Sequence, residues 1–421
     1  MSRWPVVALG DVFTIARGGS PRPIDDFITN DPNGVNWIMI GDAVEGSKYI
    51  ASTKKRIRIE GVSRSREVKP GDFLLTNSMS FGRPYILGTS GCIHDGWLVL
   101  SPREKNVDQD YFYHLLGSPI IYAEFARLAA GAVVKNLNSE LVRGVKVPLP
   151  PLPEQRRIAD ILDKADAIRR KRKEAIALTE ELLRSAFLEM FGDPVANPKG
   201  WAVKPLGEIV ERLEAGWSAS GDARPRQHSE YGVLKVSAVT SGFFRPGEHK
   251  AVPQAGIDRE LVSPRAGDLL FSRANTRELV AATCLVERDE PRLFLPDKIW
   301  RVIPKAKIAS TPYIRFLLAH ERFRGELTKT ATGTSGSMLN VSMEKLRALR
   351  APIPPYSLQE KFAHVVWTGL GAKATHERAR EAADKLFSSL IHQSFRGGLA
   401  AANGADGSQL GLLERGGRGH D

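Results

Sequence analysis

The chain has 421 residues, and its 60 Lys and Arg against 48 Asp and Glu give a formal net charge of +12 at pH 7. With 42% hydrophobic and 26% charged residues it is not a largely disordered protein, and its length predicts two or three domains. No apolar run approaches the ~18 residues that span a membrane, the start lacks a secretion signal, and two cysteines cannot form a disulfide framework or a cysteine zinc site, so we expect a cytoplasmic protein.

The first part of the chain predicts a domain rich in short strands and turns. Apolar runs at residues 35–40, 72–75 and 96–100 are typical of strands. The second run begins with Asp72, which Gly71 directly precedes, so that the two form a Gly-Asp pair. Such a pair favours a turn, because Gly tolerates positive φ and Asp bonds its own backbone. We therefore expect a mixed α+β fold for this part.

A proline-rich connector and a long helix come next. Residues 147–153 cannot be helical, because proline lacks an amide hydrogen and restricts the residue before it. Residues 154–191 contain no Pro or Gly, and Gly192 ends the predicted helix. The helix shows the three-four spacing of a coiled-coil seam. The seam residues are Ile158, Leu162, Ala165, Arg172, Ile176, Thr179, Leu183, Ala186 and Met190.

The rest of the chain repeats this plan. The pattern Trp-x(4)-Leu-Gly at Trp4 returns at Trp201, and further positions match in the same order, 196 to 204 residues apart. Offsets that change slowly indicate a duplicated module with small loop insertions, and the period is far too long for a solenoid repeat. The matched pairs include Gly71 and Gly267, Asp95 and Asp297, Tyr111 and Tyr313, Asn136 and Asn340, and Gln155 and Gln359.

The second copy ends as the first one does. Strands are predicted at residues 233–236 and 299–303, followed by a proline connector at 351–355. A helix is predicted at about 358–395, but Gly369 and Gly371 interrupt it, so its continuity is left open. Residues 399–421 are rich in Gly and predict a flexible tail.

The two predicted helices carry apolar stripes that are not stable in water. We expect them to pack on each other, and packing of each helix on its own globular domain is the alternative. Two similar domains held apart by such a rod would read two stretches of one DNA duplex at a spacing set by the rod. Because the domains diverge outside their framework residues, the site would be asymmetric and bipartite.

The residues at the proline-to-helix junction carry a family resemblance. Residues 148–155 and 158–163, the Trp-x(4)-Leu-Gly openings and the Gly-Asp-Leu-Leu-Phe run at 267–271 resemble those of type I restriction–modification specificity subunits. The likeness covers residues 1–398. It implies an α+β protein with two homologous mixed α/β target-recognition domains separated by two long helices packed as an antiparallel coiled coil. The domains would be 1–147 and 195–351, with proline connectors and spacer helices at 148–194 and 352–398 and a tail at 399–421.

The resemblance also implies a role. Such a subunit is non-catalytic, needs no cofactor of its own, serves phage defence and binds double-stranded DNA. It recruits two methyltransferase (modification) subunits and restriction/translocase subunits, which methylate adenine or cleave the DNA.

Two other functions stay open from the residues themselves: a fragment of a single-chain methyltransferase-nuclease, and a helical adaptor without sequence-specific DNA binding. The Pro-Pro-aromatic run at 354–356 is similar to a methyltransferase motif, but Ile353 before it cannot accept a hydrogen bond from a target amino group. A Gly-Lys-Ser/Thr P-loop does not occur. The run Glu248-His249-Lys250 is similar to a nuclease site, and a surface charge cluster is its preferred interpretation.

Loops that are rich in Arg, Asn or Gln are candidates for contact with DNA, because Arg can pair with guanine and Asn or Gln with adenine. Asn77 and Arg273 directly follow the matched Gly-Asp strands, where loops diverge to alter specificity. The basic run at 169–173 could contact phosphates between the half-sites or an acidic surface of a partner, and a solvated helix face is the preferred interpretation. The candidate DNA-binding residues are Arg64, Arg66, Asn77, Ser78, Arg83 and Lys135 in the first domain, and Arg224, Arg226, Gln227, Arg273, Asn275, Arg277 and Ser335 in the second.

Overall fold

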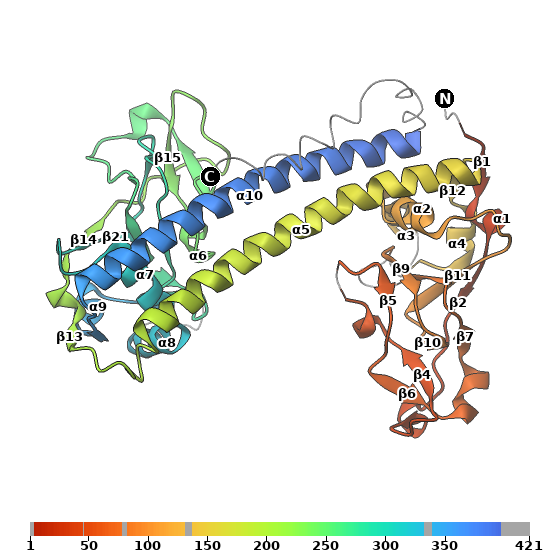
Figure 1. Cartoon of the computed structure of the whole chain (residues 1–421). Helices are drawn as coiled ribbons and strands as arrows, with labels where there is room; N and C mark the ends of the chain where they lie inside the picture. Colours follow the sequence, from red (N-terminus) through yellow and green to blue (C-terminus); the bar gives the residue numbers. More distant parts are fainter. Residues whose placement is uncertain (1–3, 45, 78–81, 131–136, 332–338, 397–421) are drawn as a thin grey trace, which may run out of the picture. The chain divides into compact units, whose positions relative to one another are not determined.

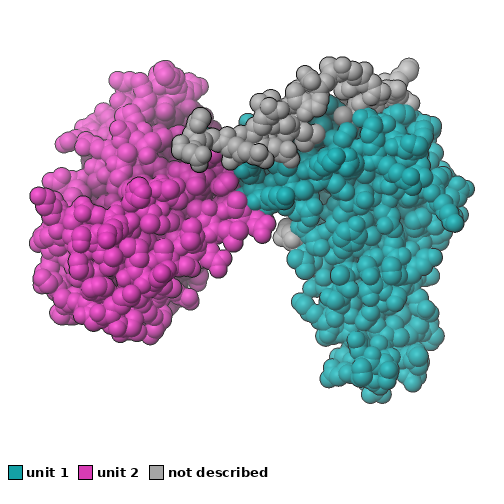
Figure 2. Space-filling model, in the orientation of Figure 1, with its two compact units in different colours: residues 1–172, 378–421 teal, residues 173–377 magenta. Residues whose placement is uncertain are grey.

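The computed structural model describes residues 4–44, 46–77, 82–130, 137–331 and 339–396 (Figure 1). The chain divides into two compact units, residues 1–172 with 378–421 and residues 173–377 (Figure 2). Two long helices, α5 (Leu152–Phe191) and α10 (Tyr356–Arg396), each contribute to both units. We call the remaining, globular part of unit 1 module 1 and that of unit 2 module 2. The expected tail at 399–421 lies outside the described residues.

Module 1 contains two five-stranded sheets, with strand orders β2-β11-β8-β9-β5 and β3-β6-β4-β10-β7, and a two-stranded pair β1-β12. The strands are β1 (Val6–Ala8), β2 (Phe13–Arg17), β3 (Ile28–Thr29), β4 (Val35–Ile38), β5 (Tyr49–Ile50), β6 (Lys55–Ile57), β7 (Arg66–Val68), β8 (Phe73–Thr76), β9 (Pro84–Leu87), β10 (Gly91–Ile93), β11 (Trp97–Pro102) and β12 (Lys146–Pro148). The helices are α1 (Leu9–Val12), α2 (Gln109–Leu116), α3 (Pro119–Ala130) and α4 (Ser139–Gly144), with 3-10 turns η1 (Ile24–Asp26), η2 (Ile40–Asp42) and η3 (Ile59–Arg64).

Module 2 follows the same plan with a four-stranded sheet β14-β21-β17-β19, a three-stranded sheet β16-β15-β20, and the pairs β13-β23 and β18-β22. The strands are β13 (Val203–Pro205), β14 (Val210–Ala215), β15 (Tyr231–Leu234), β16 (His249–Val252), β17 (Leu269–Ser272), β18 (Ala274–Asn275), β19 (Thr283–Leu285), β20 (Leu293–Phe294), β21 (Ile299–Pro304), β22 (Leu339–Asn340) and β23 (Arg350–Pro352). The helices are α6 (Ser237–Thr240), α7 (Thr311–Ala319), α8 (Glu321–Thr330) and α9 (Met343–Ala348), with η4 (Leu206–Glu208) and η5 (Gln254–Gly256).

The strands predicted from apolar runs are confirmed to within a few residues as β4, β8, β11, β15 and β21. β8 and β17 are buried along their whole length, because side chains on both faces of the central sheet are covered. Many of the strands that escaped prediction have two or three residues, which carry too little periodicity to be recognised. The longer strands β2 and β14 also escaped prediction.

The duplication is visible in individual contacts at the start of the helices. The N-cap Asp108 of α2 accepts a hydrogen bond from the amide of Tyr111, and the N-cap Ser310 of α7 accepts one from Tyr313. The hydroxyl of Tyr111 donates to the carbonyl of Pro148 (3.0 Å), and that of Tyr313 to the carbonyl of Pro352 (2.5 Å). In each module an equivalent tyrosine therefore connects the globular part to the proline connector through a hydrogen bond.

The helices α5 and α10 pack together as an antiparallel pair, as expected. In unit 1, Leu162 shares an apolar core with Ile391, and Arg169 of α5 donates from Nε to Asp384 of α10 (2.7 Å). In unit 2, Leu183 shares a core with Val366. The interpretation of residues 169–173 as a wholly solvated face is wrong at Arg169, because its charge pairs across the helices.

Each long helix also packs on a module. The alternative expectation, in which each helix packs on a globular domain, is therefore met in addition to the packing of the helices on each other. The N-terminal part of α5 lies beside α2, α3 and α4 in the core of unit 1 (Figure 1). Phe395 of α10 meets the ring of Tyr111 at 5.7 Å between centroids, and Phe191 of α5 meets Tyr313 at 4.9 Å. The two ends of the helix pair thus make equivalent contacts with the two modules.

Helix α10 is continuous through Gly369 and Gly371. A Cβ atom at Gly369 would lie 2.9 Å from the Cδ2 of Leu183 on α5, whereas one at Gly371 would meet nothing within 4 Å. Gly369 therefore allows close approach of the two helices, which answers the question that the sequence left open.

Candidate nucleic-acid interface

In module 1, polar contacts converge on Asp95, which lies in the turn between β10 and β11. Its carbonyl accepts hydrogen bonds from the Nε of Arg17 (3.0 Å) and the Nδ2 of Asn77 (2.9 Å). Its carboxylate accepts one from the hydroxyl of Ser20 (2.9 Å). The end of β2, the loop after it and the end of β8 are therefore joined at one turn.

The segment that contains Arg64 and Arg66 is attached to the same place. The hydroxyl of Ser65 donates to the carbonyl of Gly19 (2.7 Å), and Arg66 donates from Nε to the carbonyl of Arg17 (3.2 Å). Arg64 lies over the ring of Phe27, 5.4 Å from its centroid. We call Arg17, Arg22, Arg64, Arg66, Asn77 and Asp95 the Asp95 cluster.

The structure thus brings together Arg64, Arg66 and Asn77, which the sequence predicted, and adds Arg17 and Arg22, which sequence reasoning missed. The pattern Gly-x-Ser after a matched strand, at Gly18 and again at Gly216, is the signal that could have identified this loop. Asn77 is only 3% exposed, and its amide is engaged by Asp95.

The Asp95 cluster carries excess positive charge. Arg17, Arg64 and Arg66 are exposed, and within the described residues none of them forms an ion pair with a carboxylate. Exposed guanidinium groups without a carboxylate partner can donate hydrogen bonds to phosphate oxygens and to the edges of bases.

The carboxylate of Asp95 itself remains ionised. Burial raises the pKa of Asp95, but the hydrogen bond from Ser20 and the charges of His94, Arg17 and Arg22 outweigh burial and lower the pKa below its usual value. Arg22 is 82% exposed and lies 3.4 Å from this carboxylate. One ionised carboxylate thus lies among the arginines of the cluster.

Module 2 repeats the arrangement around Asp297, between β20 and β21. Arg273 donates from Nε to the carbonyl of Asp297 (2.9 Å), and the hydroxyl of Ser218 donates to its carboxylate. The guanidinium of Arg273 lies 3.7 Å from that carboxylate and 5.9 Å from the ring centroid of Trp300. Asp95 and Asp297 therefore hold equivalent turns in their two modules.

The other predicted residues of module 2 lie in two places. Asn275 accepts the amide of Thr276 with its side-chain oxygen, and Arg277 beside them is exposed. The segment at 224–227 is tied to Glu230 and His249 instead: Arg224 binds Glu230 through two hydrogen bonds (2.7 and 2.8 Å), and the backbone amide of Arg226 donates to His249.

In the segment at 224–227, the charge of Arg224 is neutralised by Glu230. The hydrogen bonds from Arg224, together with one from the amide of Gln227, lower the pKa of Glu230 to about 2, so the pair stays charged and closed at neutral pH. The Gln227 side chain is exposed, as is Arg83 in module 1. Ser78, Lys135 and Ser335 lie outside the described residues.

The nuclease-like run has a structural role. The Nδ1 of His249 lies 2.7 Å from the carbonyl of Pro246, and its Nε2 accepts the amide of Arg226, so both ring nitrogens are used. Glu248 accepts from Ser237. Across the described ranges, His, Cys, Asp and Glu do not gather in any group of three or more that could hold a metal ion. Helices that are both long and apolar enough to cross a membrane are also absent from these ranges.

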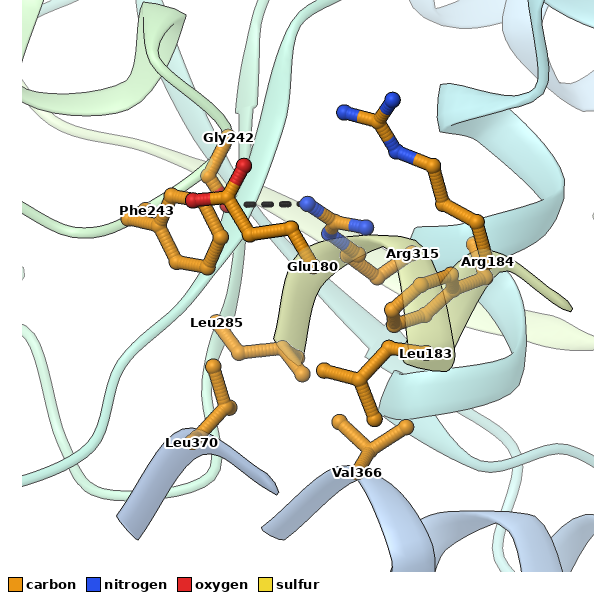
Figure 3. Close-up of a pocket in the computed structure, with 10 residues that line it drawn as sticks. Glu180, Leu183, Arg184, Gly242, Phe243, Leu285, Arg315, Val366 and Leu370 are labelled. Atoms are coloured by element: carbon orange, nitrogen blue, oxygen red, sulfur yellow. Dashed lines mark hydrogen bonds between the residues drawn. The ribbon is translucent and has the colours of Figure 1, made fainter. Parts of the chain in front are cut away.

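A small cavity in unit 2 lies between α5, α10 and α7 (Figure 3). Its volume is about 20 Å³, which is room for about one water molecule. Figure 3 shows the aliphatic side chains of Leu183 and Val366 on one side and Arg315 directed at the carbonyl of Gly242, which it reaches at 3.0 Å. Burial lowers the pKa of Arg315 to about 10. This cavity is a packing gap at the helix junction and is too small for a cofactor.

Comparison with known proteins identifies the family. Residues 1–178 match the model of the type I restriction modification DNA specificity domain. The specificity subunit of the type I restriction enzyme EcoEI of Escherichia coli is 32% identical over 174 residues, which is 41% of this chain and 29% of that protein. The specificity subunit of EcoKI of Escherichia coli K12 is 23% identical over 432 residues, covering 97% of this chain and 91% of that protein.

A solved structure supports the same assignment at the level of the fold. The crystal structure of the type I restriction–modification S subunit from M. genitalium aligns with a TM-score of 0.58 at 14% identity, over 94% of this chain and 96% of that one. The family model and the chain-wide relative favour a DNA specificity subunit over the helical-adaptor and single-chain-enzyme alternatives. Residues 1–178 therefore carry the DNA specificity domain of type I restriction–modification systems, and the chain is similar over nearly its whole length to the specificity subunits of those systems.

Proposed function

We propose that the chain reads an asymmetric, bipartite site in double-stranded DNA, one part with each module, and directs its partners to methylate adenine or cleave the DNA. The observation that supports this most is the pair of clusters around Asp95 and Asp297. The two modules keep the same framework contacts there and differ in the polar side chains around them. A shared framework with different surface groups is what two readers of different sequences require.

The proposed target-recognition domains are residues 1–147 and 195–351, and the proposed connectors and spacer helices are 148–194 and 352–398. The proposed DNA contacts are those among the predicted residues whose polar groups are exposed or only partly engaged: Arg64, Arg66, Arg83, Arg226, Gln227, Arg273, Asn275 and Arg277. Asn77 and Arg224 are engaged in the fold, and we propose that they hold loops in place. Ser78, Lys135 and Ser335 stay predictions, as does the spacing of the two domains by the helices.

The protein is one subunit of a type I complex. We propose that its partners are two modification subunits, which supply the methyl transfer, and restriction/translocase subunits, which supply cleavage. Because the protein binds DNA and its partners act on DNA, we place it in the cytoplasm.

An exchange of one module tests the two-reader proposal. Residues 1–147 are replaced by the corresponding part of a relative with a different target, and methylated adenines are mapped in a host that carries the hybrid and its modification subunits. We expect one half of the recognition sequence to change and the other to stay. The matched exchange of residues 195–351 should change the opposite half. A change in both halves with either hybrid would contradict the proposal.

A further inference from the structure

Two strand positions at the Asp95 and Asp297 clusters correspond by sheet register. Arg17, the last residue of β2, pairs with Leu98 of β11. Ala215, the last residue of β14, pairs with Trp300 of β21. Because β2 and β14 occupy the same place in their sheets, module 2 has Ala215 where module 1 has Arg17.

A second pair of positions corresponds by backbone hydrogen bonds. The amide of Asn77 donates to the carbonyl of Gly96 (3.1 Å), and the amide of Arg273 donates to the carbonyl of Lys298 (3.0 Å). Each of the two residues directly follows its matched strand, β8 or β17. Module 2 therefore has Arg273 where module 1 has Asn77.

The two modules thus place a guanidinium against the same carbonyl from different positions. In module 1 the carbonyl of Asp95 receives the Nε of Arg17, and in module 2 that of Asp297 receives the Nε of Arg273. Where Arg273 supplies the group, the strand position is Ala215 and has no donor to offer.

The fold of module 1 does not need the guanidinium for this hydrogen bond. Asn77 already donates to the carbonyl of Asp95 at 2.9 Å, so this carbonyl keeps a hydrogen-bond donor without Arg17. Arg17 is exposed and forms no ion pair with a carboxylate within the described residues. Its Nε is anchored, so the planar fork of its terminal nitrogens is held in place and loses less conformational freedom on binding an anion.

We infer that this guanidinium contacts DNA in each module, and that Arg17 in module 1 and Arg273 in module 2 are equivalent contacts supplied from different strands. The inference rests on the proposed function and names the residue that carries the contact. A guanidinium fits a phosphate or the edge of a guanine through two parallel hydrogen bonds.

Moving the group within a module tests the inference. In module 1, Arg17→Ala removes it, and Arg17→Ala with Asn77→Arg returns it from the position that module 2 uses. In module 2, Arg273→Asn removes it but keeps an amide donor for Asp297, and Arg273→Asn with Ala215→Arg returns it from the position that module 1 uses. Arg103→Ala is the matched control, since Arg103 also donates from Nε to a backbone carbonyl of β2, that of Phe13 (3.2 Å).

Binding is measured by fluorescence anisotropy with the purified chain in complex with its modification subunits, on a duplex carrying the methylation site mapped in the host genome. Each removal should weaken binding about tenfold and reduce the slope of log affinity against log salt by about 1. Each relocation should restore both quantities to near the wild-type values, and the Arg103 variant should bind as the wild type does.

The outcomes separate the two levels of the proposal. A wild-type complex without sequence-dependent binding contradicts the proposed function. A wild-type complex that binds, with removal variants of unchanged affinity and salt slope, overturns the inference alone. Loss of binding that neither relocation restores, or a removal variant that unfolds, also overturns it, because the group would then serve the local fold rather than the DNA.

Discussion

At the scale of single residues, Lys48 shows how module 1 is attached to the long helix. It is 9% exposed, and its Nζ lies 2.9 and 3.1 Å from the two carboxylate oxygens of Asp163 on α5. Asp110 pairs with the same ammonium, and the Nε2 of His114 lies 2.7 Å from Asp163. Burial raises the pKa of Asp163, but the hydrogen bonds from His114 and Lys48 outweigh it and the pKa is lowered overall. A buried ammonium is stable only when it is paired in this way.

Asp163→Asn should therefore destabilise unit 1 in a pH-dependent manner. Since the folded pKa is depressed, the carboxylate contributes its full stability above its unfolded pKa of about 4 and loses it as pH falls through the lower folded value. We expect a loss of about 2 kcal/mol at pH 7, an estimate reduced because Asp163 is 38% exposed. Urea unfolding at pH 7 and pH 3 measures it. Asp160→Asn is the control, since Asp160 and its partner Lys164 are each 62% exposed and should contribute about 0.5 kcal/mol or less. An equal loss at both pH values would rule out this account of Asp163.

At the scale of elements, α10 shows how packing overrides a local propensity. Two glycines within three residues predict a weak point, because each costs up to about 1 kcal/mol relative to alanine in a helix. The helix continues because its apolar face is buried: Phe362, Val366 and Leu370 pack in the core of unit 2. The residues of the predicted seam on α5 are buried for the same reason at Ile158, Leu162, Ala165, Ile176 and Leu183.

The two glycines should respond oppositely to substitution. Gly371→Ala meets open space and should stabilise the protein by about 0.5–1 kcal/mol. Gly369→Leu forces a side chain against Leu183 and should destabilise it by about 1–3 kcal/mol. Urea unfolding followed by circular dichroism distinguishes them. If Gly369→Leu were as stable as the wild type, the close approach of α5 and α10 at this point would be wrong.

At the scale of the whole molecule, the chain is one module used twice, down to single hydrogen bonds. Gln155 is 1% exposed, donates to the carbonyls of Asn106 and Pro150, and accepts the amide of Asp108. Gln359 is fully buried and makes the same three contacts, to Ile308, Pro354 and Ser310. One buried amide thus closes each connector onto its module.

Equivalent substitutions in the two modules should therefore cost the same. Gln155→Ala and Gln359→Ala each leave three backbone groups without this partner, and we expect about 3 kcal/mol of destabilisation for each. Gln393→Ala on the exposed face of α10 should change stability by less than about 0.5 kcal/mol. Thermal and urea unfolding of the three variants makes the comparison. A loss confined to one module would show that the two connectors are held differently.

The sequence by itself determined the duplication, the long buried strands, the proline connectors and both helices, because each depends on patterns within a short stretch or on a comparison of the chain with itself. It also located Arg273 on a loop, whereas the loop that it predicted at Arg64 and Arg66 is wrong, because Arg64 ends the 3-10 turn η3 and Arg66 begins β7. Only the tertiary structure decided which polar side chains meet. Arg17 and the Asp95 carbonyl that it reaches are 78 positions apart, and sheet register brings them together. Asn77, predicted as a base reader, has its amide directed inward by the same turn. Periodicity records which face of an element is buried, but it carries no information on which loops converge.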